Sequence, residues 1–327
     1  IAGAIISCYP KETKILFLCH TISLLTQTKI EFEKWGFGKI SCVGEGEKDL
    51  SGRIVVSTIQ SFSKLDIDER DVFDIIIIDE CHHCSSENSL YYNTLISMTA
   101  TIRIGVTATL PTNQENKLIM EGLLGEVIAE TTLQEGADLN FLSIPKIKLI
   151  RTEKIDIKDL YKYPDIYDEV IVTNRARNRL IINEIKSQNQ MGRTTLTYVS
   201  KIEHGKSLLT LAENQNISIH FIQGATNGEQ RESLRNALQS KKIMNVIATT
   251  VWKEGINIPS LNCIVIAGGG KSELSLLQTV GRGLRRDNEK NEILIIDFVD
   301  SAKYVSEHCC ERINIYLEKG WEITKGD

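Results

Sequence analysis

Ten short apolar runs constrain the fold of this chain more than any other feature of its sequence. They are apolar at consecutive rather than alternate positions, which is typical of parallel strands covered by helices on both faces. Amphipathic stretches separate them. The first series occupies 14–20, 39–46, 53–59, 74–80 and 103–109, and the second occupies 194–200, 218–224, 245–250, 263–269 and 292–299. The pattern predicts an α/β fold with two parallel sheets in tandem.

The segment from Leu139 to Tyr167 interrupts this alternation, with Pro145, Pro164 and clustered charges. A chain of 327 residues has room for two domains of about 150 residues each. We therefore expect a first domain over 1–143, a hinge over 144–167 and a second domain over 168–327.

Composition excludes several classes of protein. Hydrophobic residues make up 42% and charged residues 25% of the chain, a balance that excludes a disordered or fibrous protein. No apolar run reaches the roughly 20 residues of a membrane-spanning helix, and we expect no membrane partner. The net charge of −5 argues against coating nucleic acid through charge alone, but not against an enzyme with one basic groove.

The eight cysteines are scattered, most of them within apolar runs. This usage is typical of a reduced, intracellular protein rather than of a disulfide framework. We expect a cytoplasmic, nucleoid-associated location, as in a phage-infected bacterium.

The run DIIIIDECHH places two adjacent carboxylates at the end of a buried strand. Asp79 and Glu80 follow four isoleucines, and open α/β sheets bind ligands at the carboxyl ends of their strands. One carboxylate there can orient Mg²⁺ while the other polarises a water, as nucleotide hydrolysis requires. The plainer interpretation is that acidic residues simply end a strand.

The run QTVGRGLRR at 278–286 places Gln278, Arg282 and Arg285 at i, i+4 and i+7. A helix would present the three side chains on one face. Two guanidinium groups there suit the charge that develops on a transferring phosphoryl group. The competing interpretation is a solvated basic face.

Together these motifs resemble those of the superfamily-two helicases and translocases. Residues 79–82 resemble motif II, Thr107-Ala108-Thr109 resembles motif III, and 278–286 resembles motif VI with its arginine fingers. The resemblance continues in order through 19–27 (motif Ia), 57–62 (Ib), 196–200 (IV) and 247–259 (V). Within the superfamily, the segments around motifs IV and VI are most similar to phage recombination helicases, whose relatives include XPB-type translocases and restriction-enzyme motors.

The resemblance implies two RecA-like domains with a nucleotide cleft between them, and ATP and Mg²⁺ as cofactors. Asp79 would hold Mg²⁺, Glu80 would activate the attacking water, and His82 would couple the ATP site to motif VI. Thr107 and Thr109 are the implied coupling residues of motif III. The other implied catalytic or nucleotide-binding residues are Gly255, Asn257 (aspartate in many relatives), Gln278, Arg282 and Arg285.

The same resemblance implies contacts with nucleic-acid phosphates more than with bases. The implied residues are His20, Thr21, Thr58, Gln60, Ser200, Thr249 and Thr250. The expected function is ATP-dependent unwinding or branch migration of forked or junction DNA by a monomer, in recombination, repair or replication. A restriction-system motor, an RNA helicase and a non-hydrolysing nucleic-acid clamp are the alternatives.

One motif of the family is missing from the sequence. The P-loop G-x-x-x-x-G-K-[ST] holds phosphates with its backbone amides and lysine. Gly205-Lys206-Ser207 and Gly270-Lys271-Ser272 are decoys, with Ser200 and Val265 in place of the first glycine. The first ten residues, IAGAIISCYP, resemble the helix that follows a P-loop. We therefore expect the P-loop to precede Ile1, and hydrolysis to depend on it.

Two further clusters have competing interpretations. The sequence CHHC at 81–84 suggests zinc, but a structural site needs four directed ligands and motif II already accounts for Cys81 and His82. Arg175, Arg177 and Arg179 suit either a phosphate contact or a solvated helix face.

Overall fold

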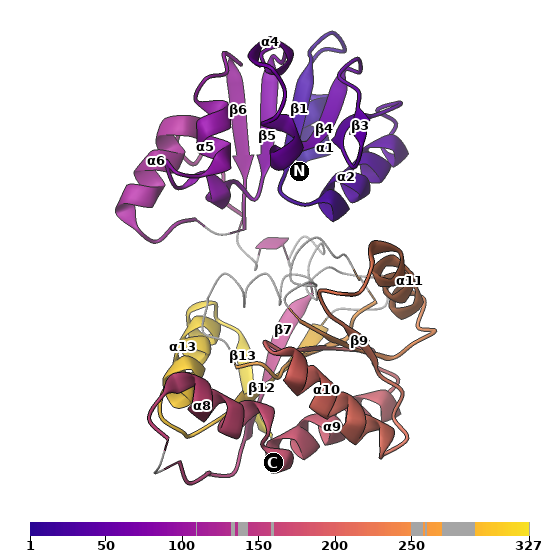
Figure 1. Cartoon of the computed structure of the whole chain (residues 1–327), viewed down its shortest axis with the longest axis vertical. Coiled ribbons are helices and arrows are strands. Elements are labelled where there is room, and N and C mark those ends of the chain that lie inside the picture. Colours follow the sequence, from indigo (N-terminus) through magenta and orange to yellow (C-terminus); the bar gives the residue numbers. More distant parts are fainter. Residues whose placement is uncertain are drawn as a thin grey trace. The chain divides into compact units, whose positions relative to one another are not determined.

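The computed structural model describes residues 1–108, 110–131, 135–136, 143–157, 160–249, 258, 260–269 and 292–326. The chain forms two compact units, Ile1–Glu130 and Thr131–Asp327, and each unit has its own sheet (Figure 1). The expected α/β fold with two parallel sheets is confirmed.

The first unit contains a six-stranded sheet in the order β3-β2-β4-β1-β5-β6. All neighbouring strands are parallel except β2 and β3. The strands are β1 (Ile15–Cys19), β2 (Ser41–Gly44), β3 (Glu47–Lys48), β4 (Ile54–Thr58), β5 (Ile75–Asp79) and β6 (Ile102–Val106). The helices are α1 (Ala2–Ser7), α2 (Ile22–Lys34), α3 (Ile59–Phe62), α4 (Ile67–Arg70), the 3-10 helix η1 (Cys81–Cys84), α5 (Leu90–Leu95) and α6 (Gln114–Leu124).

The continuously apolar strands of this unit are buried on both faces. In β1, Leu16 and Leu18 pack with residues of α3, α5 and α6, while Ile15 and Phe17 pack with residues of α1 and α2 on the opposite face. Side chains alternate across a strand, so a strand covered by helices on both sides needs apolar residues at every position. This is the physical reason for the apolar runs.

The second unit contains a seven-stranded sheet in the order β13-β7-β12-β11-β8-β10-β9, and every strand pair in it is parallel. The strands are β7 (Ile144–Arg151), β8 (Thr195–Tyr198), β9 (His220–Ile222), β10 (Asn245–Ala248), β11 (Cys263–Ile266), β12 (Glu292–Val299) and β13 (Glu322–Gly326). The helices are α8 (Tyr163–Tyr167), the π-helix η2 (Asp168–Val172), α9 (Arg175–Gln190), α10 (Ile202–Glu213), α11 (Gly228–Gln239) and α13 (Val305–Glu318).

Helices cover both faces of this sheet as well. Helices α9 and α10 lie side by side (Figure 1) and contribute Ile181, Ile185 and Leu208 to the core on one face. Leu238 of α11 and Tyr316 of α13 belong to the core on the other face. The decoy triplet 205–207 lies within helix α10, so it does not form a phosphate-binding loop.

The segment 144–167, which we expected to be a hinge, instead contributes β7 and α8 to the second unit. Strand β7 lies inside the sheet, between β12 and β13. Its two lysines are paired: Lys146 Nζ lies 2.8 Å from Glu292 Oε1, and Lys148 Nζ lies 2.9 Å from Glu184 Oε1. These two charges of the expected linker are therefore balanced by carboxylates from later segments of the chain.

Within the described residues, no helix has both the length and the apolar character needed to cross a membrane.

Candidate functional site

Three strand ends of the first unit meet at one edge of its sheet. Strand β5 pairs in parallel with β1, with Ile78 beside Leu18, and with β6, with Asp79 beside Val106. The residues that follow these strands, His20, Glu80 and Thr107, therefore emerge at the same carboxyl edge. The sheet register thus brings together segments that are far apart in the sequence.

Glu80 turns the chain sharply after β5. It adopts the left-handed conformation, with φ 51° and ψ 49°, which costs an L-residue other than glycine about 1–2 kcal/mol. Its backbone N–H donates to Asp79 Oδ1 at 3.1 Å. Strain of this kind is concentrated at functional sites, and here it lies at the two carboxylates that the sequence singled out.

His82 connects the carboxylate pair to strand β6. Its Nδ1 lies 3.0 Å from Thr107 Oγ1 and 3.3 Å from Glu80 Oε2. The side chains of His82 and Glu80 are 11% and 25% exposed, so these polar contacts are largely shielded from water. The structure therefore brings together three of the predicted residues of motifs II and III.

A row of rings extends from His82 towards the end of β1. The ring centroids of His82 and His83 are 4.3 Å apart, and those of His83 and His20 are 4.8 Å apart. Gln60 Nε2 donates to the carbonyl oxygen of His20 at 3.2 Å. Sequence analysis missed His83 as part of this site, although its place directly after motif II was a usable signal.

The hydroxyl groups of Thr21 and Thr58 cap helices. Thr21 Oγ1 accepts from the backbone N–H of Leu24, and Thr58 Oγ1 accepts from that of Ser61, as is usual for threonine at a helix N-cap. Thr58 is only 3% exposed. A nucleic-acid contact through these two hydroxyls would compete with capping, whereas Gln60 is exposed.

In the second unit, Ser200 is exposed and its hydroxyl donates to the carbonyl of Gly268 at 3.4 Å. Thr249 is buried, and its backbone N–H donates to Ile222 O. The roles predicted for both in nucleic-acid binding stay predictions. The predicted site residues that lie outside the described part of the chain are Thr109, Thr250, Gly255, Asn257, Gln278, Arg282 and Arg285.

Arg177 corrects the interpretation of the basic cluster on α9. Its side chain is fully buried, and its Nε lies 3.1 Å from Asp300 Oδ1. It is therefore neither a phosphate contact nor part of a solvated face, and only Arg175 and Arg179 of the cluster are exposed.

The cysteines of the CHHC sequence behave as apolar core residues. Burial, followed by the charge of Glu80, raises the pKa of Cys81 to about 11, and burial raises that of Cys84 to about 12. Both side chains are buried in the apolar core of the first unit. No three His, Cys, Asp or Glu side chains of the described residues form a metal site by themselves.

Magnesium needs different ligands from zinc, and Asp79 is suited to be one of them. Mg²⁺ retains waters and is bound through one or two carboxylates together with substrate phosphates, rather than by an all-protein cage. Asp79 supplies a hard oxygen ligand at the strand edge where ligands of this fold bind.

Two family models match the chain. Residues 1–112 match "Type III restriction enzyme, res subunit", and residues 176–287 match "Helicase conserved C-terminal domain". The two matches lie in the two units and include every predicted motif. The chain is a superfamily-two helicase. It therefore belongs to a class of ATP-hydrolysing enzymes.

Individual relatives agree with this assignment. The chain is 24% identical to the "ATP-dependent DNA helicase uvsW" of Enterobacteria phage T4 over 94% of this chain and 67% of that protein. It is 26% identical to "Putative helicase 22" of Sulfolobus islandicus filamentous virus over 93% of this chain and 58% of that protein. The chain thus spans 58–67% of the length of these relatives.

A solved structure with the same fold is that of S. cerevisiae Dbp5 bound to RNA and ADP BeF3. The TM-score is 0.70 at 14% sequence identity, over 100% of this chain and 82% of that one. At this identity the likeness concerns the fold alone, and it supports two tandem RecA-like units.

Proposed function

We propose that this helicase is an ATP-driven DNA translocase that acts on branched DNA. The observation that carries the proposal is the arrangement at the end of β5, where the strained Glu80 and the adjacent Asp79 are joined through His82 to Thr107. Paired carboxylates in this setting suit metal-assisted attack of water on a phosphoryl group. The ring contact between His83 and His20 adds a physical link to the predicted DNA-binding segment.

Each residue of the site has a defined task in this proposal. Asp79 holds Mg²⁺, which neutralises developing charge on the phosphates when bound. Glu80 orients the attacking water and accepts its proton, and His82, whose Nδ1 lies 3.3 Å from Glu80 Oε2, connects Glu80 to Thr107. Arg282 and Arg285 stabilise transition-state charge. Their role, and that of Gln278, stays a prediction.

DNA is the proposed nucleic-acid substrate because the T4 relative is named a DNA helicase. The proposed contacts with the DNA backbone are made by His20, Gln60 and Ser200, at the carboxyl edges of the two sheets. Contacts with phosphates carry no sequence information. We therefore expect recognition of fork or junction shape rather than of base sequence.

The decisive experiment measures ATP hydrolysis by the full-length protein with forked DNA, linear duplex DNA and single-stranded RNA, each compared with no nucleic acid. We expect the largest stimulation with the fork. Glu80→Gln should lower the stimulated rate about 100-fold or more, as expected for loss of a general base, and leave fork binding unchanged. Glu87→Gln, the same charge change at an exposed position seven residues along the chain, is the matched control.

Three results would contradict the proposal. Stimulation by RNA but not DNA would identify an RNA helicase. Equal stimulation by linear and forked DNA would exclude a preference for branched DNA and favour a restriction-type motor. Fork binding without any hydrolysis would identify a non-hydrolysing clamp.

A further inference from the structure

Three consecutive backbone carbonyls at the end of β11 are each held by a side chain from a different helix. Arg177 Nη1 of α9 donates to Ala267 O at 2.9 Å, and Arg312 Nη1 of α13 donates to Gly269 O at 2.9 Å. Between them, the hydroxyl of Tyr167 in α8 donates to Gly268 O. We call Arg177, Tyr167 and Arg312, with these three carbonyls, the carbonyl clamp.

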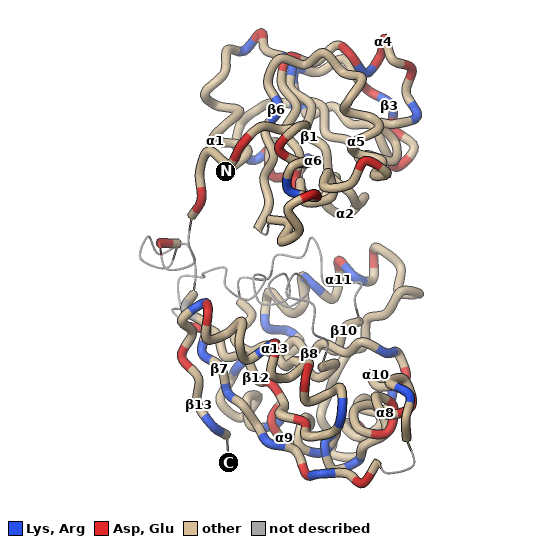
Figure 2. The backbone as a smooth tube through the Cα atoms, turned by 90° about the vertical axis from the view of Figure 1, so that its left-hand side faces the viewer, with Lys and Arg blue, Asp and Glu red and all other residues tan. Residues whose placement is uncertain are grey.

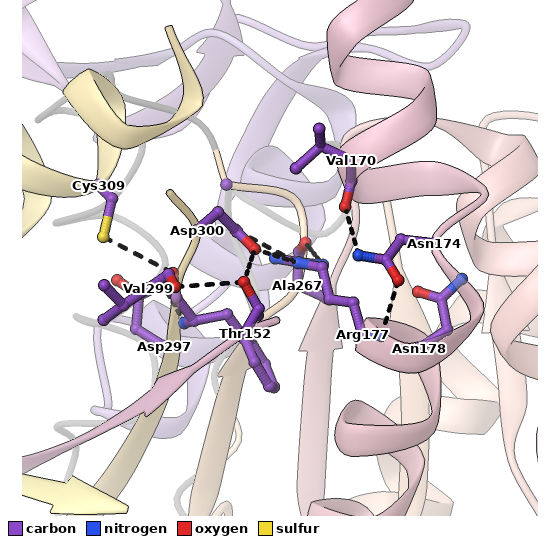
Figure 3. A network of polar contacts seen from close by, with 12 residues as sticks. Thr152, Val170, Asn174, Arg177, Asn178, Ala267, Asp297, Val299, Asp300 and Cys309 are labelled. Atoms are coloured by element: carbon purple, nitrogen blue, oxygen red, sulfur yellow. Dashed lines mark hydrogen bonds and ion pairs between the residues drawn. The ribbon is translucent and has the colours of Figure 1, made fainter. Parts of the chain in front are cut away.

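Two buried carboxylates orient the two arginines. Asp300 accepts from Arg177 Nε at 3.1 Å and from the Thr152 hydroxyl at 2.8 Å (Figure 3). Asp297 accepts from Arg312 Nε at 2.8 Å and from its Nη2 at 2.9 Å. All four charged side chains are at most 1% exposed.

Buried ion pairs are weak evidence for stability, because well-packed apolar residues of similar volume often stabilise a core as well or better. Their distinctive property is geometric: a guanidinium bonded to a carboxylate has a fixed orientation for its remaining N–H donors. In both arginines, remaining donors are directed at the carbonyls of residues 267 and 269. The clamp therefore fixes the course of the backbone at this point.

The backbone at the clamp has no room for a side chain at residue 268. A Cβ atom on Gly268 would lie 2.6 Å from Ser200 Oγ and 2.7 Å from Ser200 N, so only glycine lets β11 and the end of β8 approach this closely. Gly269 follows with φ +63°, a conformation that favours glycine. The clamp and the two glycines together set where the chain leaves the sheet edge.

The chain that leaves this point is the segment carrying Gln278, Arg282 and Arg285. A group that stabilises a transition state loses much of its effect when it is misplaced by about 1 Å. We infer that Arg177, Tyr167 and Arg312 are positioning residues for motif VI, through the fixed exit of the chain at residues 267–269. This inference rests on the proposed ATP-driven function of the same protein.

Two tyrosines provide a matched test. Tyr167 and Tyr316 are both buried, but the Tyr316 hydroxyl donates to Asp297 Oδ2 at 2.9 Å and is not bonded to any of the three carbonyls. Tyr167→Phe therefore removes a contact of the clamp, whereas Tyr316→Phe removes one hydroxyl from the same polar network and leaves the clamp donors in place. Thermal unfolding should show similar losses of stability for the two variants.

DNA-stimulated ATP hydrolysis by the full-length protein is then measured at a temperature where both variants are folded. We expect Tyr167→Phe to lower kcat about 5- to 10-fold while KM for ATP changes less than about two-fold, the pattern of a loss confined to the transition state. Tyr316→Phe should retain the kcat of the unmutated protein. An unchanged kcat for Tyr167→Phe, or equal losses for the two variants, overturns the inference.

A second readout does not depend on hydrolysis. Lys271, two residues beyond the clamp in the sequence, is a potential trypsin site, and cleavage after it should be several-fold faster in Tyr167→Phe than in Tyr316→Phe. Equal cleavage rates in the two variants would overturn the inference that the clamp fixes the exit of the chain. Absence of DNA-stimulated turnover in the unmutated protein overturns the proposed function instead, so the two failures are distinguishable.

Discussion

Helix α10 buries His204 completely against its neighbour α9. The Nε2 atom of His204 lies 2.9 Å from Asn178 Oδ1. Burial, followed by the positive charge of Arg177, lowers the pKa of His204 to about 3. The native protein therefore keeps this imidazole neutral at pH values where an exposed histidine is charged.

This depressed pKa predicts a loss of stability in mild acid. The unfolded chain binds the proton near pH 6.5, whereas the native state binds it only near pH 3. The contribution of His204 is therefore fully present above the unfolded pKa and is lost as pH falls from there towards the folded one. Between pH 7 and pH 5 the loss amounts to about 1–2 kcal/mol.

Urea unfolding at the two pH values, compared between the unmutated protein and His204→Gln, isolates this contribution. Glutamine retains an N–H that can donate to Asn178 but does not titrate. The variant should be less sensitive to acid than the unmutated protein. Identical pH dependence in both would show that His204 is not responsible.

At the scale of elements, the approach of η1 to β6 depends on one glycine. A Cβ atom on Gly105 would lie 2.7 Å from Cys81 Sγ and 2.8 Å from Leu124 Cδ1. Gly105 therefore lets η1, which carries His82, pack directly against the strand that precedes Thr107. The contact between His82 and Thr107 requires this packing.

Gly105→Ala should force η1 away from β6. We expect overpacking to cost about 1–3 kcal/mol, and DNA-stimulated hydrolysis to fall because His82 is displaced. Gly122→Ala is the control, since Gly122 lies in α6 with open space around its Cβ position. Alanine there should stabilise the helix by about 0.5–1 kcal/mol. Thermal unfolding that shifts in the same direction for both variants would contradict this account.

At the scale of the whole molecule, charge is distributed rather than concentrated. Lys and Arg are interspersed with Asp and Glu along the chain in both units (Figure 2), and the net charge is −5. The overall charge therefore does not attract DNA. Binding must depend on local phosphate contacts such as those proposed for His20, Gln60 and Ser200.

If binding depends on local phosphate contacts, the affinity for forked DNA should depend on salt concentration but not on base sequence. If Lys and Arg side chains neutralise about four phosphates beside these contacts, fork affinity should fall on the order of 100-fold between 50 and 200 mM salt. Fluorescence anisotropy with forks of equal shape and unrelated sequence measures both properties. An affinity independent of salt, or a strong preference for one sequence, would contradict phosphate recognition.

Much of this molecule could be predicted from local patterns. Apolar runs such as that of β5 report burial on both faces directly, because every residue of such a strand must be apolar. The order of the motifs identified the superfamily, and Thr107 ends the apolar run that follows the run of Asp79 and Glu80 in the chain. These properties depend on neighbouring residues in the sequence or on strand order, so the sequence alone determined them.

Only the tertiary structure decided the partners of charged residues. From the sequence, the lysines of β7 were expected to lie in a linker, and the arginines of α9 were expected to lie on the protein surface. Their carboxylate partners, Glu292 for Lys146 and Asp300 for Arg177, lie more than a hundred residues away in the sequence. Whether a charge is solvated or buried depends on contacts that form only when distant segments meet, and local sequence patterns do not record such contacts.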